Sequence, residues 1–429
     1  MKILLLSPQA ALFGTEKHVL ALAAGLRRLG DQAEVVVPCR GELVDKLSEA
    51  GIPVHVTRWR GSRVIGLARL MRLVYVGRYD IVHTHAYSRL PCLAARLVRT
   101  GRTVETRHVA ALKETGLHGA SRLRWLDRLL DRCCDAVIGG STEVRDEAIR
   151  RDVPPEKIHV IRYGVSLPQI PQDARIAVRQ AVRIGLGLEE ACVVVGAVAR
   201  LSEQKGLSFL IRAAALLQDR PSVRFAIVGD GDQRGKLEEL RRELRLERKV
   251  LLCGYRRDLA ELLCAFDILA IPSLFEGMPL ILPEAMASGL PVVASSLDSL
   301  REAEGKSGAA VFVPPRNAHA LAASLRELID DPERRREMAA AGRARSGCFR
   351  VDAMVEEIRR LYRGLAERRE IRTMGRDKSN GGCSPRQEAL SGLRGSSNRR
   401  ARDPGGREDP QERLARQRSE GEGFRRGVP

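Results

Sequence analysis

Short runs of apolar residues alternate with segments of helical apolar spacing from the start of the chain. The runs KILLL and AEVVV are each followed by such a segment, at about residues 16–29 and 43–50. The alternation continues through PVHV, DIVHTH, TVETRH, AVIGG and IHVIRY. Strands that alternate with helices in this way are typical of a parallel sheet covered on both faces. The pattern predicts one α/β domain over residues 1–167.

The alternation weakens over residues 168–188, which are polar and contain prolines. We expect this stretch to link two domains, because a new series of strands begins with CVVVGAVA at residue 192 and continues with VRFAIVG, VLLCG, DILAIP and PVVAS. This series predicts a second domain over residues 189–350. Two doubly wound domains in tandem leave a cleft between them, which is a common place for a ligand.

The C-terminal part of the chain changes character once more. Helical spacing continues to about residue 368, and we expect residues 351–368 to form a helix that crosses back to the N-terminal domain. Residues 369–429 are rich in Arg and Gly and almost free of apolar runs. Such a segment cannot bury enough apolar surface to fold, so we expect it to be disordered.

The composition limits the class of protein. The 429 residues are 44% hydrophobic, which suffices for two buried cores. Nowhere do eighteen apolar residues follow one another, and the run over residues 3–6 is too short for a signal peptide. The nine cysteines include no C-x-x-C pair, which argues against a disulfide framework and a zinc site. We therefore expect a cytoplasmic protein that contacts a membrane, if any, at its inner face.

The most informative stretch is GAVARLSEQKG, where a buried strand ends and a helix begins. Arg200 and Lys205 lie in the turn between them, beside a helix N-terminus whose free N–H groups favour an anion. The two cations predict a diphosphate site. Their alternative interpretation is that both are solvated charges of a loop.

A second stretch, FEGMPLILPEAMASGLPVVAS, carries two carboxylates eight residues apart. Glu276 precedes a short predicted helix and Glu284 lies within it. Carboxylates accept hydrogen bonds from sugar hydroxyls, while the N–H groups near Leu280 and Ile281 can face a phosphate. An isolated pair would more often be surface or capping groups. The closely spaced glycines and prolines of this stretch favour a binding site instead.

These two stretches together resemble the donor-binding half of the family 4 retaining glycosyltransferases, also called glycosyl transferases group 1. The resemblance covers residues 1 to about 365, including FGTEKHVLALAAGLRRLG, VGDGDQRGKLEEL and FDILAIPSLFEGMP. It implies the GT-B fold, in which two Rossmann-like domains face a central cleft. It also implies transfer of a sugar, with retention, from a nucleotide diphosphate-sugar to a hydroxyl of a glycan or lipid-linked acceptor. The expected setting is cell-envelope polysaccharide or lipopolysaccharide synthesis.

The resemblance also implies roles for single residues of the donor site. Arg200 and Lys205 would bind the donor diphosphate, and Glu276 would contact the transferred sugar. Glu284, the second carboxylate of the family's Glu-x7-Glu motif, would contact the nucleotide ribose. The implied donor-binding residues are Gly14, Arg200, Lys205, Glu276, Gly277, Leu280, Ile281 and Glu284.

On the acceptor side, His108 matches a histidine that the family places near the reacting sugar, and His85 is an expected acceptor contact. The implied catalytic residues are Glu276, His108, Arg200 and Lys205. We expect no cofactor and no metal, because no Asp-x-Asp pair or His cluster stands where it could hold an ion.

Two departures from the family pattern fall on the acceptor side. The family commonly has Asn-Gly-Val-Asp before the linker, where this chain has Tyr163, Gly164, Val165 and Ser166. The N-terminal loop carries one glycine, Gly14, where two often occur. Neither departure removes a diphosphate cation or a glutamate.

The formal net charge of +19 implies a polyanionic partner. Residues 58–78 interleave arginines with Trp59, Ile65 and leucines at roughly helical spacing. This stretch could dock on an anionic membrane surface, or it could be a helix that packs on the sheet and exposes an arginine face. We favour the second interpretation.

Three rival functions fit parts of the sequence. Gly229, Gly231 and Gly235 suggest an NAD(P)-dependent oxidoreductase, but the last glycine is displaced and the strand before them does not open the first domain. The charge suggests a nucleic-acid-binding protein, but no helix-turn-helix, zinc or aromatic platform supports it, so no nucleic acid is expected. The third rival is a GT-B protein that binds a nucleotide sugar without turning it over.

Overall fold

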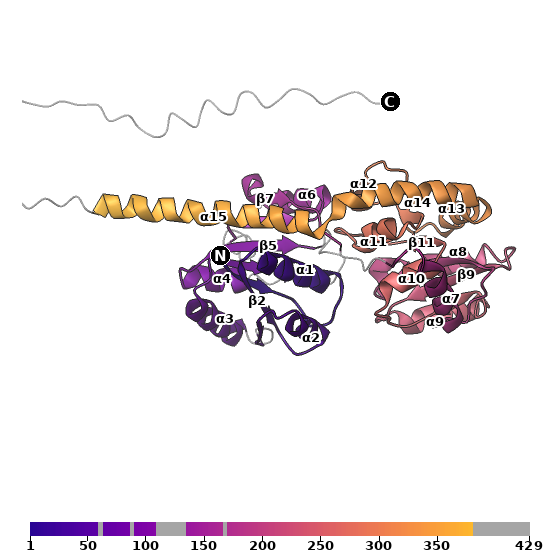
Figure 1. Cartoon of the computed structure of the whole chain (residues 1–429), viewed down its shortest axis with the longest axis horizontal. Helices are drawn as coiled ribbons and strands as arrows, with labels where there is room; N and C mark the ends of the chain where they lie inside the picture. The colour runs from indigo at the N-terminus through magenta and orange to yellow at the C-terminus, as the bar shows by residue number, and fades with distance from the viewer. Residues whose placement is uncertain (59–62, 86–89, 109–133, 166–169, 381–429) are drawn as a thin grey trace, which may run out of the picture. The chain divides into compact units, whose positions relative to one another are not determined.

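The computed structural model describes residues 1–58, 63–85, 90–108, 134–165 and 170–380. Within these ranges the chain forms two parallel β-sheets, each with helices on its faces (Figure 1). The prediction of an α/β protein with two doubly wound, Rossmann-like domains is confirmed.

The first sheet has the strand order β3-β2-β1-β4-β5-β6-β7. Its strands are β1 (Lys2–Leu6), β2 (Gln32–Val37), β3 (Val54–Val56), β4 (Ile81–Thr84), β5 (Arg102–Arg107), β6 (Ala136–Gly139) and β7 (Ile158–Val160). The helices along it are α1 (Gly14–Arg28), α2 (Glu42–Glu49), α3 (Arg63–Gly77), α4 (Leu90–Leu97), α6 (Thr142–Arg150) and the short η1 (Pro155–Lys157).

The second sheet has the strand order β10-β9-β8-β11-β12-β13. Its strands are β8 (Val193–Val198), β9 (Val223–Val228), β10 (Val250–Leu252), β11 (Ile268–Ile271), β12 (Val292–Ser295) and β13 (Ala310–Val313). The helices along it are α7 (Arg175–Gly185), η2 (Glu203–Lys205), α8 (Leu207–Ala215), α9 (Arg234–Glu243), α10 (Leu259–Ala265), α11 (Ile281–Ser288), α12 (Asp298–Glu304), α13 (Ala318–Asp330), α14 (Pro332–Ser346) and η3 (Gly347–Phe349).

The central strands are buried on both faces, which explains their continuous apolar runs. In β1, Ile3 and Leu5 pack in one cluster with α1, whereas Leu4 and Leu6 pack in another with α3. All four side chains are fully buried. Strand β8 divides its side chains between two clusters in the same way. Each sheet is therefore the middle layer of a three-layer domain.

The strand orders also show where a ligand should bind. Each order reverses at one point, between β1 and β4 in the first sheet and between β8 and β11 in the second. Ligands of open α/β sheets bind beyond the carboxyl ends of the strands at such a point. The segments that follow these four strands contain Gly14, His85, Arg200 and Glu276.

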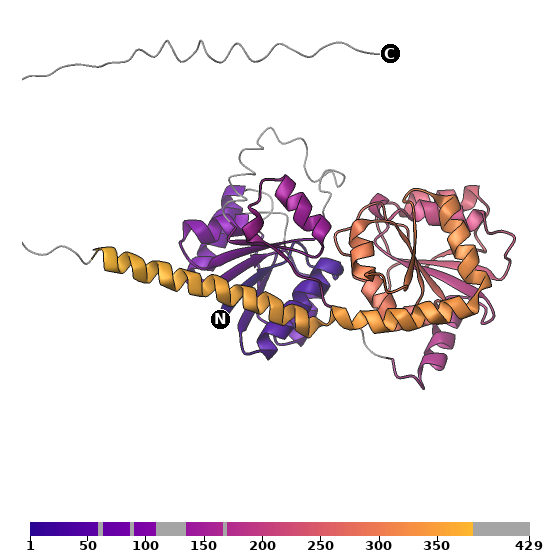
Figure 2. The ribbon, with the colours of Figure 1, turned by 90° about the horizontal axis from the view of Figure 1, so that it is seen from above.

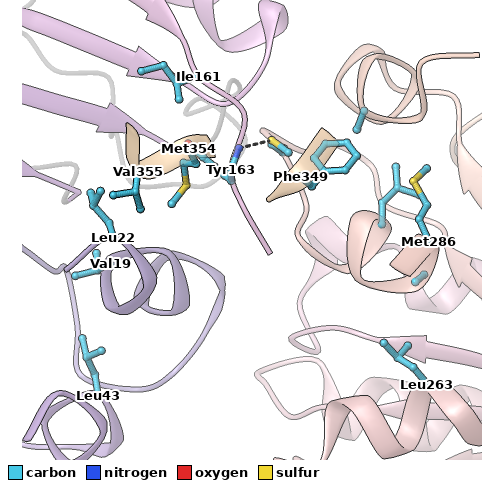
Figure 3. Packing of buried hydrophobic residues seen from close by; sticks show 14 of the residues in the cluster. Val19, Leu22, Leu43, Ile161, Tyr163, Leu263, Met286, Phe349, Met354 and Val355 are labelled. Carbon is cyan, nitrogen blue, oxygen red and sulfur yellow. Dashed lines mark hydrogen bonds between the residues drawn. The ribbon is translucent and has the colours of Figure 1, made fainter. Parts of the chain in front are cut away.

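The last helix, α15 (Val351–Asn380), packs on α1 of the N-terminal domain (Figures 2 and 3). A Cβ at Gly25 of α1 would lie only 2.5 Å from the Val355 side chain, so the two helices approach closely. Figure 3 shows Val355 beside Leu22 of α1. The helix continues past the predicted end at residue 368. The rest of the predicted disordered tail, residues 381–429, lies outside the described residues.

Part of the expected interdomain linker is helical. Residues 175–185 form α7, which contacts α10 of the second domain. Arg183 is 1% exposed and donates to Asp267 Oδ2 at 2.7 Å and to the Ala265 carbonyl oxygen at 3.0 Å. The arginines make this segment look polar in the sequence. In the structure they pair with residues of the second domain and hold the segment in place.

Candidate active site

The turn between β8 and α8 carries the two cations of the predicted diphosphate site. Lys205 ends the 3-10 turn η2, and Gly206 follows with a left-handed backbone, φ 58°. A Cβ at Gly206 would lie 2.1 Å from the carbonyl oxygen of Pro272, so no side chain fits there. The turn therefore lies tightly against the end of β11 and brings Lys205 to the loop that carries Glu276.

Lys205 and Glu276 form an ion pair. The Lys205 ammonium donates to Glu276 Oε1 at 2.5 Å, and the Ser273 hydroxyl donates to the same oxygen at 2.7 Å. Glu276 is only 5% exposed, and a buried carboxylate needs such partners. Two residues with separate predicted roles thus contact each other directly, and each fixes the orientation of the other.

Arg200 has a different environment. It is exposed at the carboxyl end of β8 and forms no ion pair or side-chain hydrogen bond with the residues that the structure describes. The backbone around it is well anchored, because the N–H of Leu201 donates to the Asp230 carbonyl oxygen at 2.9 Å. A guanidinium on a fixed backbone, with its donors uncommitted, is suited to bind an incoming phosphate.

The start of α11 adds backbone donors to this edge. Leu280 at the N-cap makes no side-chain cap, and Pro283 has no N–H. The first-turn N–H groups of Ile281 and Leu282 have no acceptor within the helix and are available to a phosphate. The preceding loop is fixed at Gly277, whose carbonyl oxygen accepts from the Ser141 hydroxyl at 2.8 Å.

Glu284 is almost fully buried within α11 and pairs with a residue of the first domain. Lys17 Nζ, in the first turn of α1, lies 3.6 Å from Glu284 Oε1. Burial raises the pKa of Glu284, and the Lys17 charge opposes that rise. Lys17 therefore favours the ionised carboxylate that the ribose hydroxyls would need as an acceptor.

Gly14 begins α1 and lies close to the start of α11. A Cβ at Gly14 would be 3.9 Å from Leu280 Cδ1, an ordinary contact, so the space beside this glycine is not filled by protein. Glu16 holds the loop in place, because its Oε2 accepts from the Phe13 N–H at 3.3 Å. Glu16 is fully buried, and burial raises its pKa to about 7, while hydrogen bonds and the Arg200 charge oppose the rise.

The carboxyl ends of β4 and β5 hold imidazoles, of which His83 and His85 are buried and His108 is partly buried. Nδ1 of His85 lies 3.3 Å from Nε2 of His108, so the predicted acceptor-side and catalytic histidines are in contact. The Tyr163 ring lies 5.2 Å from the His108 ring and 4.5 Å from that of His18. We call the four neighbouring histidines the histidine cluster; they are His18, His83, His85 and His108.

Burial lowers the pKa of every member of the histidine cluster, and that of His18 falls to about 3. His83 is fully satisfied, since one ring nitrogen lies 2.5 Å from the Tyr362 hydroxyl and the other 2.7 Å from that of Thr106. Both nitrogens of His18 and Nε2 of His85 have no partner among the described residues. The cluster is therefore neutral, and part of its hydrogen-bonding capacity is unused.

The sequence prediction did not assign roles to Lys17, Glu16 or His18. All three follow Gly14 in the first turn of α1, at the reversal point of the first sheet. That position is the signal that could have drawn attention to them. Tyr163, which stands where the family commonly has Asn, fills space between the histidines, and its N–H donates to Met278 Sδ at 3.3 Å (Figure 3). Ser166 lies outside the described residues.

The sequence is similar to those of known proteins over both domains. The sequence model described as Glycosyltransferase Family 4 matches residues 14–168, and that of Glycosyl transferases group 1 matches residues 179–345. The UDP-Gal:alpha-D-GlcNAc-diphosphoundecaprenol alpha-1,3-galactosyltransferase of Escherichia coli is 32% identical over 306 residues, which are 66% of this chain and 78% of that protein. The chain belongs to the family 4 glycosyltransferases. The predicted family is confirmed.

A second relative of this glycosyltransferase is the D-inositol 3-phosphate glycosyltransferase of Corynebacterium urealyticum, 30% identical over 79% of this chain and 82% of that protein. Solved structures support the fold. Anabaena HepE in complex with UDP-glucose has a TM-score of 0.74 at 24% identity and covers 85% of this chain and 100% of its own. WaaG, a glycosyltransferase involved in lipopolysaccharide biosynthesis, has a TM-score of 0.67 at 18% identity, covering 83% and 98%.

The oxidoreductase rival is wrong, because the chain belongs to the family 4 glycosyltransferases. Two of the three glycines behind that rival have a packing role instead. A Cβ at Gly229 would lie 1.8 Å from the Ala199 carbonyl oxygen, and one at Gly231 would lie 2.4 Å from that of Leu201. Both glycines let the end of β9 pack against the Arg200 turn. No group of three or more His, Cys, Asp or Glu side chains within the described ranges could hold a metal ion.

Proposed function

We propose that this glycosyltransferase moves a hexose from a UDP-sugar to a hydroxyl of a lipid-linked saccharide, with retention, at the inner face of a cell membrane. The donor would be held by four residues at the carboxyl edge of the second sheet, which we call the donor edge. They are Arg200, Lys205, Glu276 and Glu284.

The Lys205–Glu276 pair beside the uncommitted Arg200 is the observation that carries this proposal. Departure of a nucleoside diphosphate leaves negative charge on its phosphate. A fixed guanidinium, an ammonium and the N–H groups that begin α11 stabilise that charge as it develops, with no reorganisation cost at the moment of reaction. These groups supply the positive charge without a metal ion.

Donor entry would divide the resident ion pair between two parts of the ligand. The diphosphate draws Lys205, and the sugar hydroxyls take its place on Glu276 Oε1, which keeps its hydrogen bond from Ser273. Glu284 accepts from the ribose hydroxyls while Lys17 keeps the carboxylate ionised. His108 faces the transferred sugar from the first domain, and His85 meets the acceptor. Domain closure on the donor limits hydrolysis by water.

The comparisons support the donor and acceptor classes. The Escherichia coli relative is named for UDP-galactose and for a diphosphoundecaprenol-linked sugar, and HepE binds UDP-glucose. A diphosphoundecaprenol-linked acceptor stays at a membrane surface, so an enzyme that uses one must meet it there. Retention is expected from the family, and we assign no separate nucleophile among the described residues.

The donor class is tested first by ligand-induced stabilisation with UDP-glucose, UDP-galactose, UDP-GlcNAc, GDP-mannose and ADP-glucose. We expect the UDP-sugars to raise the melting temperature most. Nucleotide release in the presence of a short polyprenyl diphosphate-linked sugar then measures turnover. The anomeric configuration of the product, read by NMR, tests retention.

The site assignment is tested with Lys205→Ala and Glu276→Ala. Each should lower kcat/KM by about 100-fold or more, because each removes charge stabilisation or sugar contacts. Lys46→Ala and Glu49→Ala remove an exposed Lys–Glu pair of α2 and serve as matched controls. Folded variants that transfer sugar at the parental rate would falsify the assignment. Donor binding without nucleotide release would favour the rival that binds the sugar nucleotide without turnover.

A further inference from the structure

One face of α3 combines exposed apolar side chains with arginines. Helix α3 packs on the first sheet through buried Leu70 and Val74. On its other side Val64 is 78% exposed, Tyr75 67% and Val76 71%. Single exposed apolar residues are common, but several on one helix face mark an interaction surface. The sequence interpretation that we favoured, a packed helix with an exposed arginine face, did not include the exposed apolar side chains of that face.

Charge distinguishes this face from an ordinary protein contact. Helix α3 contains no Asp or Glu, and Arg69 and Arg72 are exposed between its apolar residues. Arg69 donates to the Arg58 carbonyl oxygen at 3.0 Å and forms no ion pair with the residues that the structure describes. Arg69, Arg72 and Val76 of α3 line a groove of about 550 Å³ together with Leu73, Val56, Thr57 and Arg58. An occupant of this surface must accept apolar side chains and supply negative charge.

We propose that this face of α3 docks on an anionic lipid surface. The α3 face comprises Val64, Ile65, Arg69, Arg72, Tyr75 and Val76. The apolar side chains would enter the boundary between headgroups and acyl chains, while the arginines reach the lipid phosphates. None of the described helices is long and apolar enough to cross a membrane, so attachment through this surface would lie in the plane of the interface.

The role of this docking rests on the proposed function, since docking would bring the donor edge to a lipid-linked acceptor. Binding to vesicles, however, can be measured without donor or acceptor. Absence of vesicle binding would leave donor binding and turnover of a short-chain acceptor unaffected, whereas failure of those assays would not alter vesicle binding. The two proposals therefore fail separately.

The experiment is flotation of the full chain with vesicles of phosphatidylcholine alone and of phosphatidylcholine with phosphatidylglycerol. The parent should float with the anionic vesicles only. Tyr75→Ser/Val76→Ser and Arg69→Gln/Arg72→Gln should each lower the bound fraction by about tenfold. Circular dichroism confirms that both variants fold.

Matched controls remove the same side-chain types elsewhere. Ile176→Ser/Ile184→Ser deletes two exposed isoleucines of α7, and Arg242→Gln/Arg248→Gln deletes two exposed arginines of the second domain. Both should float like the parent. The proposal is overturned if the α3 variants float like the parent. That result would mean that another basic segment binds the anionic vesicles. It is also overturned if the controls lose binding equally, or if the α3 face mediates concentration-dependent self-association without lipid.

Discussion

The two sheets of this glycosyltransferase present opposite chemistry at equivalent positions. At the carboxyl edge of the second sheet, Lys205 and Glu276 form an ion pair 2.5 Å apart, and Arg200 is exposed. At the same edge of the first sheet the histidine cluster is buried, and burial keeps its rings neutral. The same type of sheet thus carries charged side chains at one carboxyl edge and neutral imidazoles at the other.

Under the proposed function, this difference would match the needs of the two halves of the substrate. A departing diphosphate develops negative charge and needs fixed positive groups. A sugar and an acceptor hydroxyl carry no net charge, so they need hydrogen-bonding groups rather than ions. Substitutions at each edge can test whether the charged edge binds the diphosphate and the neutral edge the sugar and the acceptor.

Removing the uncommitted cation should have the largest effect. Arg200→Gln should lower kcat/KM by about 100-fold to 1000-fold, because it deletes charge stabilisation of the leaving group. The melting temperature should not change, since Arg200 forms no ion pair within the described chain. Arg212→Gln, an exposed arginine of α8, is the control. Near-parental kcat/KM in Arg200→Gln would contradict the role of the charged edge.

The neutral edge should instead make the protein sensitive to acid. The pKa of His18 is about 3 in the folded protein and about 6.5 unfolded, so below pH 6.5 the unfolded chain binds a proton that the folded chain does not. Stability should therefore fall as pH drops from about 6.5 toward 3, and His18 should contribute about 2 kcal/mol to this loss at pH 5.

Urea unfolding at pH 7 and pH 5 measures this dependence on acid. His18→Phe should flatten the pH dependence relative to the parent, because the ring that resists protonation is gone. An equal slope in parent and variant would show that His18 does not titrate on unfolding.

Loss of His108 should affect chemistry and not donor affinity. His108→Gln keeps a polar side chain but removes the imidazole, and we expect kcat to fall about tenfold while the Kd for UDP stays within twofold. Calorimetry measures the Kd, and His319→Gln on α13 is the control. Weaker UDP binding in His108→Gln would mean that the neutral edge also grips the donor nucleotide.

The smallest effect is expected where the two edges meet. Lys17→Met removes the charge that favours ionised Glu284, so the raised pKa of that carboxyl should rise further. UDP binding should weaken only about threefold at pH 7.5, but it should fail at a higher pH than in the parent as the solution is acidified. Glu284→Gln should abolish this loss of UDP binding at low pH. If Lys17→Met acted only through lost packing, the pH dependence of UDP binding would match that of the parent.

Most of the fold could be predicted from the sequence. Buried parallel strands leave continuous apolar runs, and amphipathic helices separate them, so both sheets were visible in the pattern. Helix α7 could not be predicted, because its arginines give the sequence the polar character of a solvated linker. In the structure, Asp267 and backbone carbonyl oxygens accept hydrogen bonds from these arginines. A buried, paired charge has no signature in a hydrophobicity pattern.

The donor edge was also predicted, since its residues lie in two short stretches whose spacing matches a known motif. The structure adds that Lys205 and Glu276, 71 residues apart, are hydrogen-bonded partners. It adds Lys17, whose partner Glu284 is in the other domain. Such contacts depend on how the fold places the turns in space, and the spacing of residues along the chain does not predict them.

The sequence alone determined the two-domain α/β plan, the family and the residue types of the donor edge, because periodicity and motif spacing are local properties of the chain. Only the tertiary structure decided that four histidines from α1, β4 and the end of β5 share one buried, neutral cluster. It also decided that the exposed face of α3 is apolar as well as basic. Both depend on which side of an element packing covers, and burial sets both the charge of an imidazole and the solvent exposure of a valine.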